Sequence, residues 1–344
     1  MTDEIRAEID RHGAIPFERF MELALYGEHG FYTRLDGGSA GRRGDFLTSP
    51  EVGPLFGAVV ARMLDAEWAR LGQPEPFTVV DAGAGPGTLA RAVHAATPAC
   101  RDAMSYVAVE TSPAQRERHP DGVRSVAALA DVGPPNSIDG VVIANELLDN
   151  VPFRLAVFDG GWREAYVLVD GRGDFAERLS APFDPVPPEL PATAPHGARA
   201  PLMQRASDLV AVARDLVRSG SVVMFDYGVP RTAELALRPW RDWLRTYRDN
   251  ARGEHYLTSP GMQDITADVP VDQLPSHDAL RTQAQWLARW GIEDLVAEGK
   301  AVWAERAARP DLEAMRMRSR VSESEALLDP SGLGAFLALE WRTP

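Results

Sequence analysis

The chain has 344 residues, of which 45% are hydrophobic, so we expect one large α/β core with sizeable additions or two interlocked lobes. Its formal net charge of −14 at pH 7 argues against nucleic acid as the main partner, because phosphate binding requires a basic face. Its single cysteine, Cys100, excludes an internal disulfide and a cysteine-based metal cluster.

Residues 1 to about 75 are predicted to form a helical N-terminal lobe. The stretch "FGAVVARMLDAEWARLG" indicates one core-facing helical stripe, made of Val59, Val60, Met63, Leu64, Trp68 and Leu71. The opening "MTDEIRAEIDRHG" is charged, and no later stretch approaches about eighteen consecutive apolar residues. We therefore expect a soluble cytoplasmic protein without membrane insertion.

Residues 76–228 alternate between strand-like and helix-like patterns. The predicted elements are a strand at 77–81, a helix from Thr88, a strand at 106–110, a short helix after Pro113, a weak strand near Val123 and a strand at 138–145. This alternation is typical of a doubly wound, mostly parallel, Rossmann-like sheet, and it predicts the α/β fold class.

An insertion at about 153–201 interrupts this core. Asp159-Gly160-Gly161 lies between two strand-like runs and predicts a β-hairpin. The proline-rich stretch 181–201 is expected to be a mobile surface loop or a separate lobe. A helix over 203–220, stopped by Gly220, and a strand at 221–228 follow.

Residues 229–344 are expected to form the substrate side of the molecule. The pattern is irregular from Val229 to about Asp272 and mostly helical after it, and "GAFLALEW" near the end predicts a final strand of the sheet. No internal repeat is visible.

The stretch "FTVVDAGAGPGTLAR" combines a strand, a glycine turn and a helix start, an order typical of nucleotide-like ligands. A phosphate-binding P-loop would need a lysine after its last glycine, but Thr88 occupies that position. A dinucleotide fingerprint has the spacing G-x-G-x-x-G, which this turn lacks, and Pro86 has no N–H to donate to a pyrophosphate. Asp81 suits the cationic sulfonium and amino acid moiety of S-adenosylmethionine and would repel a pyrophosphate. The glycines that would approach this ligand are Gly83, Gly85 and Gly87. A glycine turn without a ligand is the alternative.

The strand "YVAVE" ends in Glu110, about twenty residues after the glycines. This position favours a carboxylate that binds the two ribose hydroxyls of the adenosyl group. Glu110 could also be a structural acid at the end of a strand. Dehydrogenases also bind ribose hydroxyls through an acid at this position, so Glu110 alone does not identify the ligand. It is the pair of Asp81 and Glu110 around a turn unsuited to phosphate that favours S-adenosylmethionine.

The strand end at "ANELLDNVP" carries the predicted reactive side chains. Asn145 and Glu146 follow a core strand, and Glu146 and Asp149 are three residues apart at the start of a helical turn, so both carboxylates could face the same way. Paired carboxylates near a methyl donor would fit a guanidinium group. The alternative is structural, since Asn145 is a natural helix cap and acids favour a helix N-terminus.

The segment "GDFLTSPE" (44–51) reads as a capping box at Thr48, Ser49, Pro50 and Glu51, which needs no function. The seven histidines show no ligand spacing, so no metal site is expected.

These motifs together resemble one family across about residues 15–339, the family of the mitochondrial complex I assembly factor that is a protein arginine methyltransferase. The similar segments are "GDFLTSPEVGPLFG", "DAGAGPGTLAR", "VAVETSP", "ANELLDNVPF", "MFDYG", "GMQDITADV" and "GLGAFLAL". The resemblance implies a class I methyltransferase fold, S-adenosylmethionine bound at Gly83, Gly85 and Glu110, and a helical N-terminal lobe that closes over it. It also implies that Thr48, Pro50 and Glu51 belong to the donor or substrate pocket.

The chain departs from the family pattern after Asp264, where Asp268 replaces a histidine, Pro270 an acid and Val271 an aromatic residue. The donor motif is intact, whereas the acceptor stays open between a protein arginine and a small molecule methylated on oxygen, nitrogen or carbon. A donor-binding assembly factor without catalysis is a third reading, which the retained Glu146 disfavours. The oligomeric state does not follow from the sequence.

Overall fold

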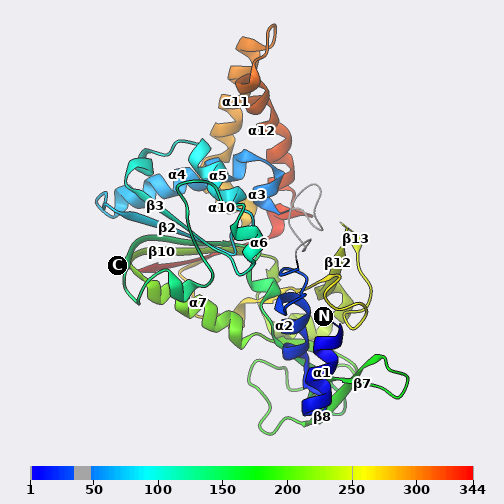
Figure 1. The fold of residues 1–344 in the computed structure, drawn as a ribbon. Helices are drawn as coiled ribbons and strands as arrows, with labels where there is room; N and C mark the ends of the chain where they lie inside the picture. Colours follow the sequence, from blue (N-terminus) through cyan, green and yellow to red (C-terminus); the bar gives the residue numbers. More distant parts are fainter. Residues whose placement is uncertain (1, 35–47, 250, 344) are drawn as a thin grey trace.

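A computed structural model describes residues 2–34, 48–249 and 251–343, and a seven-stranded sheet lies at its centre (Figure 1). The strand order is β16-β17-β10-β5-β2-β3-β4. The parallel strands are β2 (Phe77–Ala82), β3 (Met104–Val109), β4 (Arg124–Val126), β5 (Ile138–Asn145) and β10 (Val217–Asp226). β17 (Leu337–Thr343) pairs antiparallel with both β10 and β16 (Ala279–Thr282).

Helices cover both faces of this sheet because its central strands bury apolar side chains on alternate sides. Val79, Ile143 and Phe225 belong to one core with α4 (Pro54–Arg70), α5 (Thr88–Ala95) and α10 (Gln283–Arg289). Val80 and Val142 belong to the other core with α7 (Gln204–Leu216). The short elements α3 (Ser49–Val52), η1 (Ala99–Asp102), α6 (Pro113–Arg116) and η2 (Leu129–Asp131) complete the connections.

The boundary between α7 and β10 lies earlier than the sequence suggested. α7 ends at Leu216, and Gly220 lies within β10 rather than at a helix end. Gly220 has φ 143°, and a Cβ there would lie 1.8 Å from the carbonyl oxygen of Gly140 on the neighbouring strand. The glycine is needed for close strand contact, which a sequence cannot distinguish from a helix stop.

The predicted hairpin forms part of a second sheet, in the lower part of Figure 1. β6 (Arg154–Phe158) and β7 (Trp162–Val169) pair antiparallel around Asp159-Gly160-Gly161, which confirms the turn. β8 (Phe175–Pro182), β9 (Arg199–Leu202) and β1 (Ile15–Pro16) complete the sheet. The proline-rich stretch thus begins and ends in strands of this sheet.

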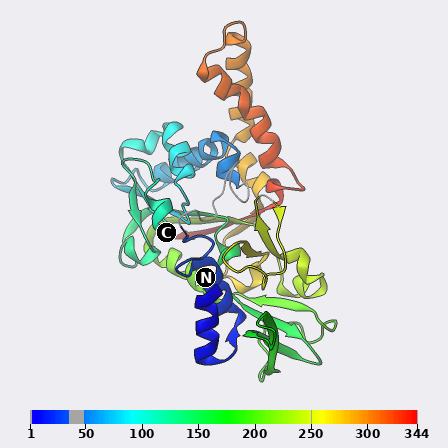
Figure 2. The same ribbon diagram turned by 45° about the vertical axis from the view of Figure 1, so that its right-hand side comes forward.

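The helices expected in residues 1 to 75 lie in two places (Figures 1 and 2). α1 (Thr2–His12) and α2 (Phe17–Tyr26) pack beside the second sheet, whereas α3 and α4 pack beside α5 on the central sheet. α1 and α2 lie at the second sheet because β1, the strand between them in the sequence, pairs with β7, and both helices contact β7.

The segment expected to be irregular contains short elements. β12 (Leu244–Arg248) pairs antiparallel with β13 (Ala251–Arg252) and β14 (Asp264–Ala267), and β11 (Gly228–Val229) pairs with β15 (Val269–Pro270). α8 (Thr232–Leu237) and α9 (Trp240–Trp243) lie between β11 and β12, and η4 (Val271–Gln273) follows β15. Strands of two to five residues give little periodicity, so the sequence pattern missed them.

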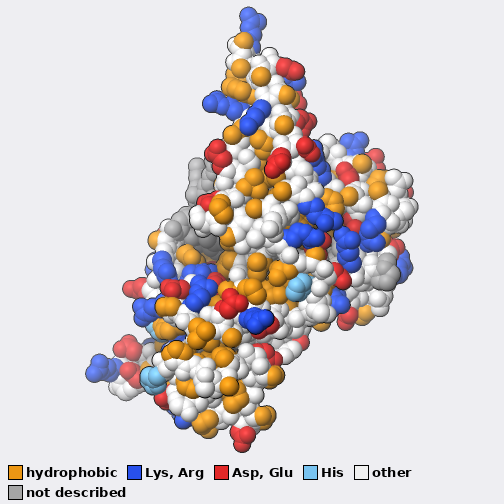
Figure 3. Space-filling model, turned by 180° about the vertical axis from the view of Figure 1, so that it is seen from behind, with side chains coloured by type: hydrophobic (Ala, Val, Ile, Leu, Met, Phe, Trp, Pro, Cys, Tyr) orange, Lys and Arg blue, Asp and Glu red, His pale blue; other side chains and the backbone are white. Residues whose placement is uncertain are grey.

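α11 (Ile292–Arg306) and α12 (Leu312–Leu328) form a hairpin that projects from the body in Figures 1 and 2, and η5 (Leu333–Ala335) follows it. Figure 3 shows this hairpin from behind, with basic, acidic and hydrophobic side chains interspersed along it. Within the described ranges, every helix is too short or too polar to cross a membrane.

Candidate active site

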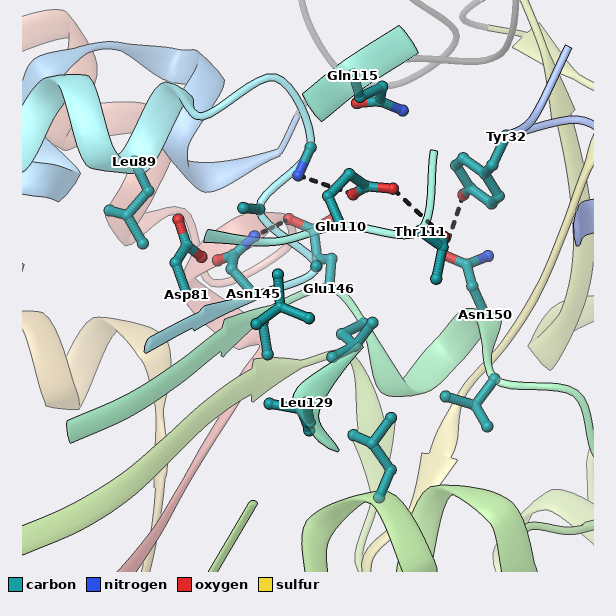
Figure 4. A pocket seen from close by; sticks show the side chains of 18 of the residues that line it. Tyr32, Asp81, Leu89, Glu110, Thr111, Gln115, Leu129, Asn145, Glu146 and Asn150 are labelled. Carbon is teal, nitrogen blue, oxygen red and sulfur yellow. Dashed lines mark hydrogen bonds between the residues drawn. The ribbon is translucent and has the colours of Figure 1, made fainter. Parts of the chain in front are cut away.

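A cavity of about 500 Å³ lies at the carboxyl ends of the parallel strands. Most of the predicted site residues line it: Thr48, Pro50, Glu51, Asp81, Gly83, Gly85, Glu110, Asn145 and Glu146 (Figure 4). Gly87 and Asp149 are not among the lining residues. The cavity therefore brings together segments that are far apart in the sequence.

The glycine turn between β2 and α5 forms one wall of the cavity. Gly83 and Gly85 have φ values of 73° and 53°, in the left-handed region that favours glycine. A Cβ on Gly83 would lie 3.0 Å from Leu147 Cδ1, so a side chain would also crowd the neighbouring wall. Gly87, with φ 80°, caps the start of α5 and acts through the turn rather than at the cavity.

Glu110 lies at the end of β3 and is fixed by the backbone of the glycine turn. The Gly85 N–H donates to Glu110 Oε2 at 3.0 Å, and the Ser112 N–H donates to Glu110 Oε1 at 2.8 Å. The Thr111 hydroxyl donates a long hydrogen bond of 3.4 Å to Oε1, which a ligand hydroxyl could replace, and Oε2 can accept one further hydrogen bond. The side chain is thus oriented to receive two hydroxyl donors from the cavity.

Asp81 lies at the end of β2, and the Tyr106 hydroxyl donates to its Oδ2 at 3.1 Å. Burial raises the pKa of Asp81 to about 7, against the lowering effect of the Tyr106 hydrogen bond, and the charge of Glu110 raises it further. A cation in the cavity would favour its ionised form.

Thr48, Pro50 and Glu51 reach the cavity from α3. Thr48 makes no side-chain capping hydrogen bond, so the capping-box interpretation is wrong. The carboxylate of Glu51 instead accepts from the Thr88 hydroxyl at 2.5 Å, across the gap between α3 and α5. The first part of the motif, residues 44–47, lies outside the described residues.

Glu146 directly follows β5 and has φ 52°, an uncommon conformation for a residue with a side chain. Its backbone N–H donates to the Phe225 carbonyl at 2.8 Å. Its Oε1 accepts from Asn145 Nδ2 at 3.0 Å and from the Ser49 N–H at 3.3 Å. Burial and then the charge of Asp149 raise the pKa of Glu146 to about 8.

Asp149 lies in the turn η3 (Leu148–Asn150), behind the cavity wall. Its Oδ2 accepts from the Thr266 hydroxyl at 2.5 Å and from the Tyr227 hydroxyl, and burial raises its pKa. The expectation that Glu146 and Asp149 face the same way is not met, because Glu146 precedes η3 and is not on a common helical turn with Asp149.

Asp226, at the end of β10, holds this turn. Its Oδ2 accepts the N–H groups of Leu147, Leu148 and Asp149 at 3.2, 2.8 and 3.3 Å. Burial, together with the charges of Asp149 and Glu146, raises its pKa well above the usual range. Asp226 therefore positions Glu146 without lining the cavity.

Sequence reasoning missed two tyrosines of the cavity wall, Tyr26 and Tyr32. Their rings stack at 5.6 Å between centroids, and both contact Asn150 through their hydroxyls. The Tyr32 hydroxyl also donates to Asp264 at 3.1 Å, and burial raises the pKa of Asp264 to about 7. No local pattern marks these tyrosines, because the end of α2 and the turn that follows it meet the cavity only through the tertiary fold.

The three departures from the family pattern lie beside this site. Asp268 pairs with Arg238 at 3.1 Å and with Arg245 at 2.8 Å, and Arg245 lies over the Tyr227 ring. Pro270 ends β15 and Val271 begins η4, and both are buried. These positions are structural supports rather than cavity residues.

The chemistry of the cavity fits S-adenosyl-L-methionine. Four of the side chains that line it are acids: Glu51, Asp81, Glu110 and Glu146. Among the described residues, one basic side chain lines it, Arg205, and that side chain forms ion pairs with Glu18 and Glu22. Such a cavity favours a cationic sulfonium over a pyrophosphate. Glu110 would hold the ribose hydroxyls and the glycine turn would approach the amino acid moiety, while Ala128 and Leu129 offer an apolar surface.

Comparison with known families agrees with this fit. The model of a family described as "Putative S-adenosyl-L-methionine-dependent methyltransferase" matches residues 59–290, more than half of the chain. A solved structure from Burkholderia thailandensis, described as a "likely methyl transferase" bound to S-adenosyl-homocysteine, has a TM-score of 0.82 and 26% identity. The match covers 99% of this chain and 91% of that one, so the fold is an α/β methyltransferase fold.

Curated relatives are named as protein arginine methyltransferases. The mitochondrial NDUFAF7 homolog of Drosophila melanogaster is 28% identical over 78% of this chain and 68% of its own length. Human mitochondrial NDUFAF7 is 23% identical over 80% of this chain and 68% of its own length. From the family match and the bound product of its structural neighbour, the chain belongs to the S-adenosyl-L-methionine-dependent methyltransferase family.

Proposed function

We propose that this methyltransferase modifies an arginine side chain of a protein. The observation that carries the proposal is Glu146, a carboxylate that lines the donor cavity and whose orientation is set by Asn145 and Ser49. A carboxylate beside a methyl donor suits a guanidinium group, which presents several N–H donors in one plane. The names of the curated relatives support the same acceptor.

Glu146 has the acid–base properties that the reaction requires. When bound, S-adenosyl-L-methionine supplies a methyl group and its sulfur keeps the bonding electron pair, so the acceptor nitrogen gains a carbon and must lose a proton. Glu146, whose pKa is about 8, can hold and release a proton near neutral pH, and a guanidinium beside it would favour its ionised form. Asn145 would keep the carboxylate aimed at the acceptor.

The remaining acceptor side of the cavity suits a cation as well. Tyr26 and Tyr32 line the cavity, and aromatic rings attract guanidinium groups by cation–π contacts. Asp149 acts behind the wall in this proposal, where its negative charge raises the pKa of Glu146. Its partners Tyr227 and Thr266 would keep it in place.

The test is to incubate the purified protein and donor carrying an isotopically labelled methyl group with a desalted extract of its own cells. Mass spectrometry should find labelled methylarginine in protein, and the Glu146→Gln variant should give at least about a hundredfold less. A matched Glu117→Gln variant, altered at an exposed glutamate, should behave as the unaltered protein. The same reaction is repeated with an extract that has not been desalted. If the labelled methyl group then appears only in small molecules, the acceptor is a small molecule and not a protein.

A further inference from the structure

A second hollow, of about 110 Å³, lies on the small sheet of β12, β13 and β14, and we call it the arginine hollow. Arg241, Arg245 and Arg252 line it together with Trp240 and Tyr256. Its volume is about a fifth of the 500 Å³ of the donor cavity, which suits one side chain. It is too small for a second nucleotide-like ligand.

The arginine hollow is basic in a molecule whose net charge is −14. Within the described part of its lining, Glu254 is the one acid, and burial lowers the pKa of the neighbouring His255. The Arg241 guanidinium lies 5.1 Å from the Trp240 ring centroid, and Arg252 donates to the Arg241 carbonyl. The exposed Arg241 and Arg252 side chains therefore have guanidinium donors left for a ligand.

Arg245 is the third arginine of the hollow and the least exposed one. Its terminal nitrogen Nη1 pairs with Asp268 at 2.8 Å and donates to the Asp242 carbonyl at 2.8 Å, and its Nε is buried. Arg245 therefore contributes positive charge to the lining, whereas the exposed Arg241 and Arg252 supply the donors that a ligand can reach.

β12, which lines the arginine hollow, pairs with β14, which supports the active site from behind. Arg245 on β12 is opposite Thr266 on β14, and Thr266 donates to Asp149. Arg245 also lies over the ring of Tyr227, which donates to the same carboxylate. Arg245 thus connects the hollow, through Thr266 and Tyr227, to Asp149 behind the cavity wall.

We propose that the arginine hollow binds an aspartate or glutamate side chain of the acceptor protein, near the arginine that is methylated. This inference rests on the proposed function and adds a substrate class, an arginine accompanied by an acidic residue. Charge complementarity carries it, since three guanidinium groups surround a space of side-chain size.

The test uses a library of fluorescent twelve-residue peptides with a fixed central arginine and random flanks, offered to the protein with saturating S-adenosyl-homocysteine. Peptides bound by the unaltered protein should be enriched in acidic residues at a defined offset from the arginine. The double variant Arg241→Gln/Arg252→Gln should bind them about tenfold more weakly. Arg248→Gln is the control, because Arg248 is an exposed arginine of β12 that lies between Arg241 and Arg252 in the sequence but does not line the hollow.

Unchanged binding of S-adenosyl-homocysteine by the double variant shows that its fold is intact. Three outcomes of the library experiment would overturn the proposal: no bound peptide, bound peptides without acidic enrichment, or equal enrichment in the double variant. The proposal would also be overturned if the hollow bound inorganic phosphate but no acidic peptide. A second library with central lysine separates the two ideas. Equal acidic enrichment there, lost in the double variant, would support the arginine hollow and contradict arginine as the acceptor.

Discussion

Glu110 shows how a single carboxylate can serve both the fold and the ligand. Because it accepts from the Gly85 and Ser112 N–H groups, its removal frees two backbone donors and loosens the glycine turn. We predict that Glu110→Ala weakens S-adenosyl-homocysteine binding by about 1–3 kcal/mol, the range for a lost charged hydrogen-bond acceptor. Calorimetry checks this, with Glu117→Ala as the control; unchanged affinity in a folded variant would place the ribose elsewhere.

Glu146 makes a prediction about pH. Since burial and the charge of Asp149 raise its pKa to about 8, the free protein holds a proton on this carboxyl near neutral pH. If the ionised form receives the acceptor's proton, kcat/KM for the acceptor should rise with pH, up to about tenfold per unit, and level off at or below pH 8, because the cationic donor favours the ionised form. The donor must be saturating, because Asp81, with a pKa of about 7, also titrates in this range.

The control for this profile is Glu146→Gln. Its turnover should fall by about 10²–10⁴, while its donor affinity stays nearly unchanged. Any residual activity should lack the rise toward pH 8. A variant that keeps normal turnover would return Glu146 to a structural role in the strained turn after β5.

Residues at strand ends were predictable from the sequence, and residues brought in by distant segments were not. Asp81, Glu110 and Glu146 each follow an apolar run, so their shared edge follows from the parallel sheet. Tyr32 and Asp264 are 232 positions apart and meet only through tertiary packing. Asp149 lies behind the cavity wall rather than in its lining, and the left-handed backbone of Glu146 that precedes it cannot be read from the sequence.

At the scale of elements, the turn η3 depends on the last residue of β10. Asp226 accepts three backbone N–H groups, so Asp226→Ala would leave them buried without an acceptor. We predict a loss of about 2–4 kcal/mol in the free energy of unfolding, measured by urea denaturation, and a fall in turnover as Glu146 moves. Asp226→Asn keeps an acceptor oxygen and should lose less than half as much.

The matched control for this element is Asp139→Ala, at the other end of the same sheet, where Asp139 pairs with the exposed Arg218. A surface pair contributes about 0–1 kcal/mol, so this variant should be nearly neutral. Similar losses at Asp139 and Asp226 would contradict the capping role. Long elements such as α4 and β5 were predictable from periodicity, whereas η3 and the strands of β12–β14 depend on partners far along the chain.

At the scale of the whole molecule, the donor cavity and the layer of residues behind its wall contain acids whose burial raises their pKa values. Asp81 and Asp264 are raised to about 7 and Glu146 to about 8, and the pKa values of Asp149 and Asp226 are raised as well. A carboxyl whose folded pKa exceeds its unfolded value of about 4 binds more protons in the folded state. The stability it contributes is complete below about pH 4 and is lost as pH rises through its folded pKa.

We therefore predict that the free energy of unfolding of the ligand-free protein falls between about pH 5 and pH 8, by up to about 1.4 kcal/mol per pH unit for each such acid. His94 and His255, whose pKa values are lowered by burial, act in the opposite direction but are fewer. Glu146→Gln removes one of the acids, so its stability should decline less steeply up to pH 8 than that of the unaltered protein. Saturating S-adenosyl-L-methionine should reduce the decline too, because the cationic donor binds the ionised carboxylates more tightly. Thermal and urea unfolding at a series of pH values measure both effects, and identical slopes in the unaltered and Glu146→Gln proteins would show that Glu146 titrates normally.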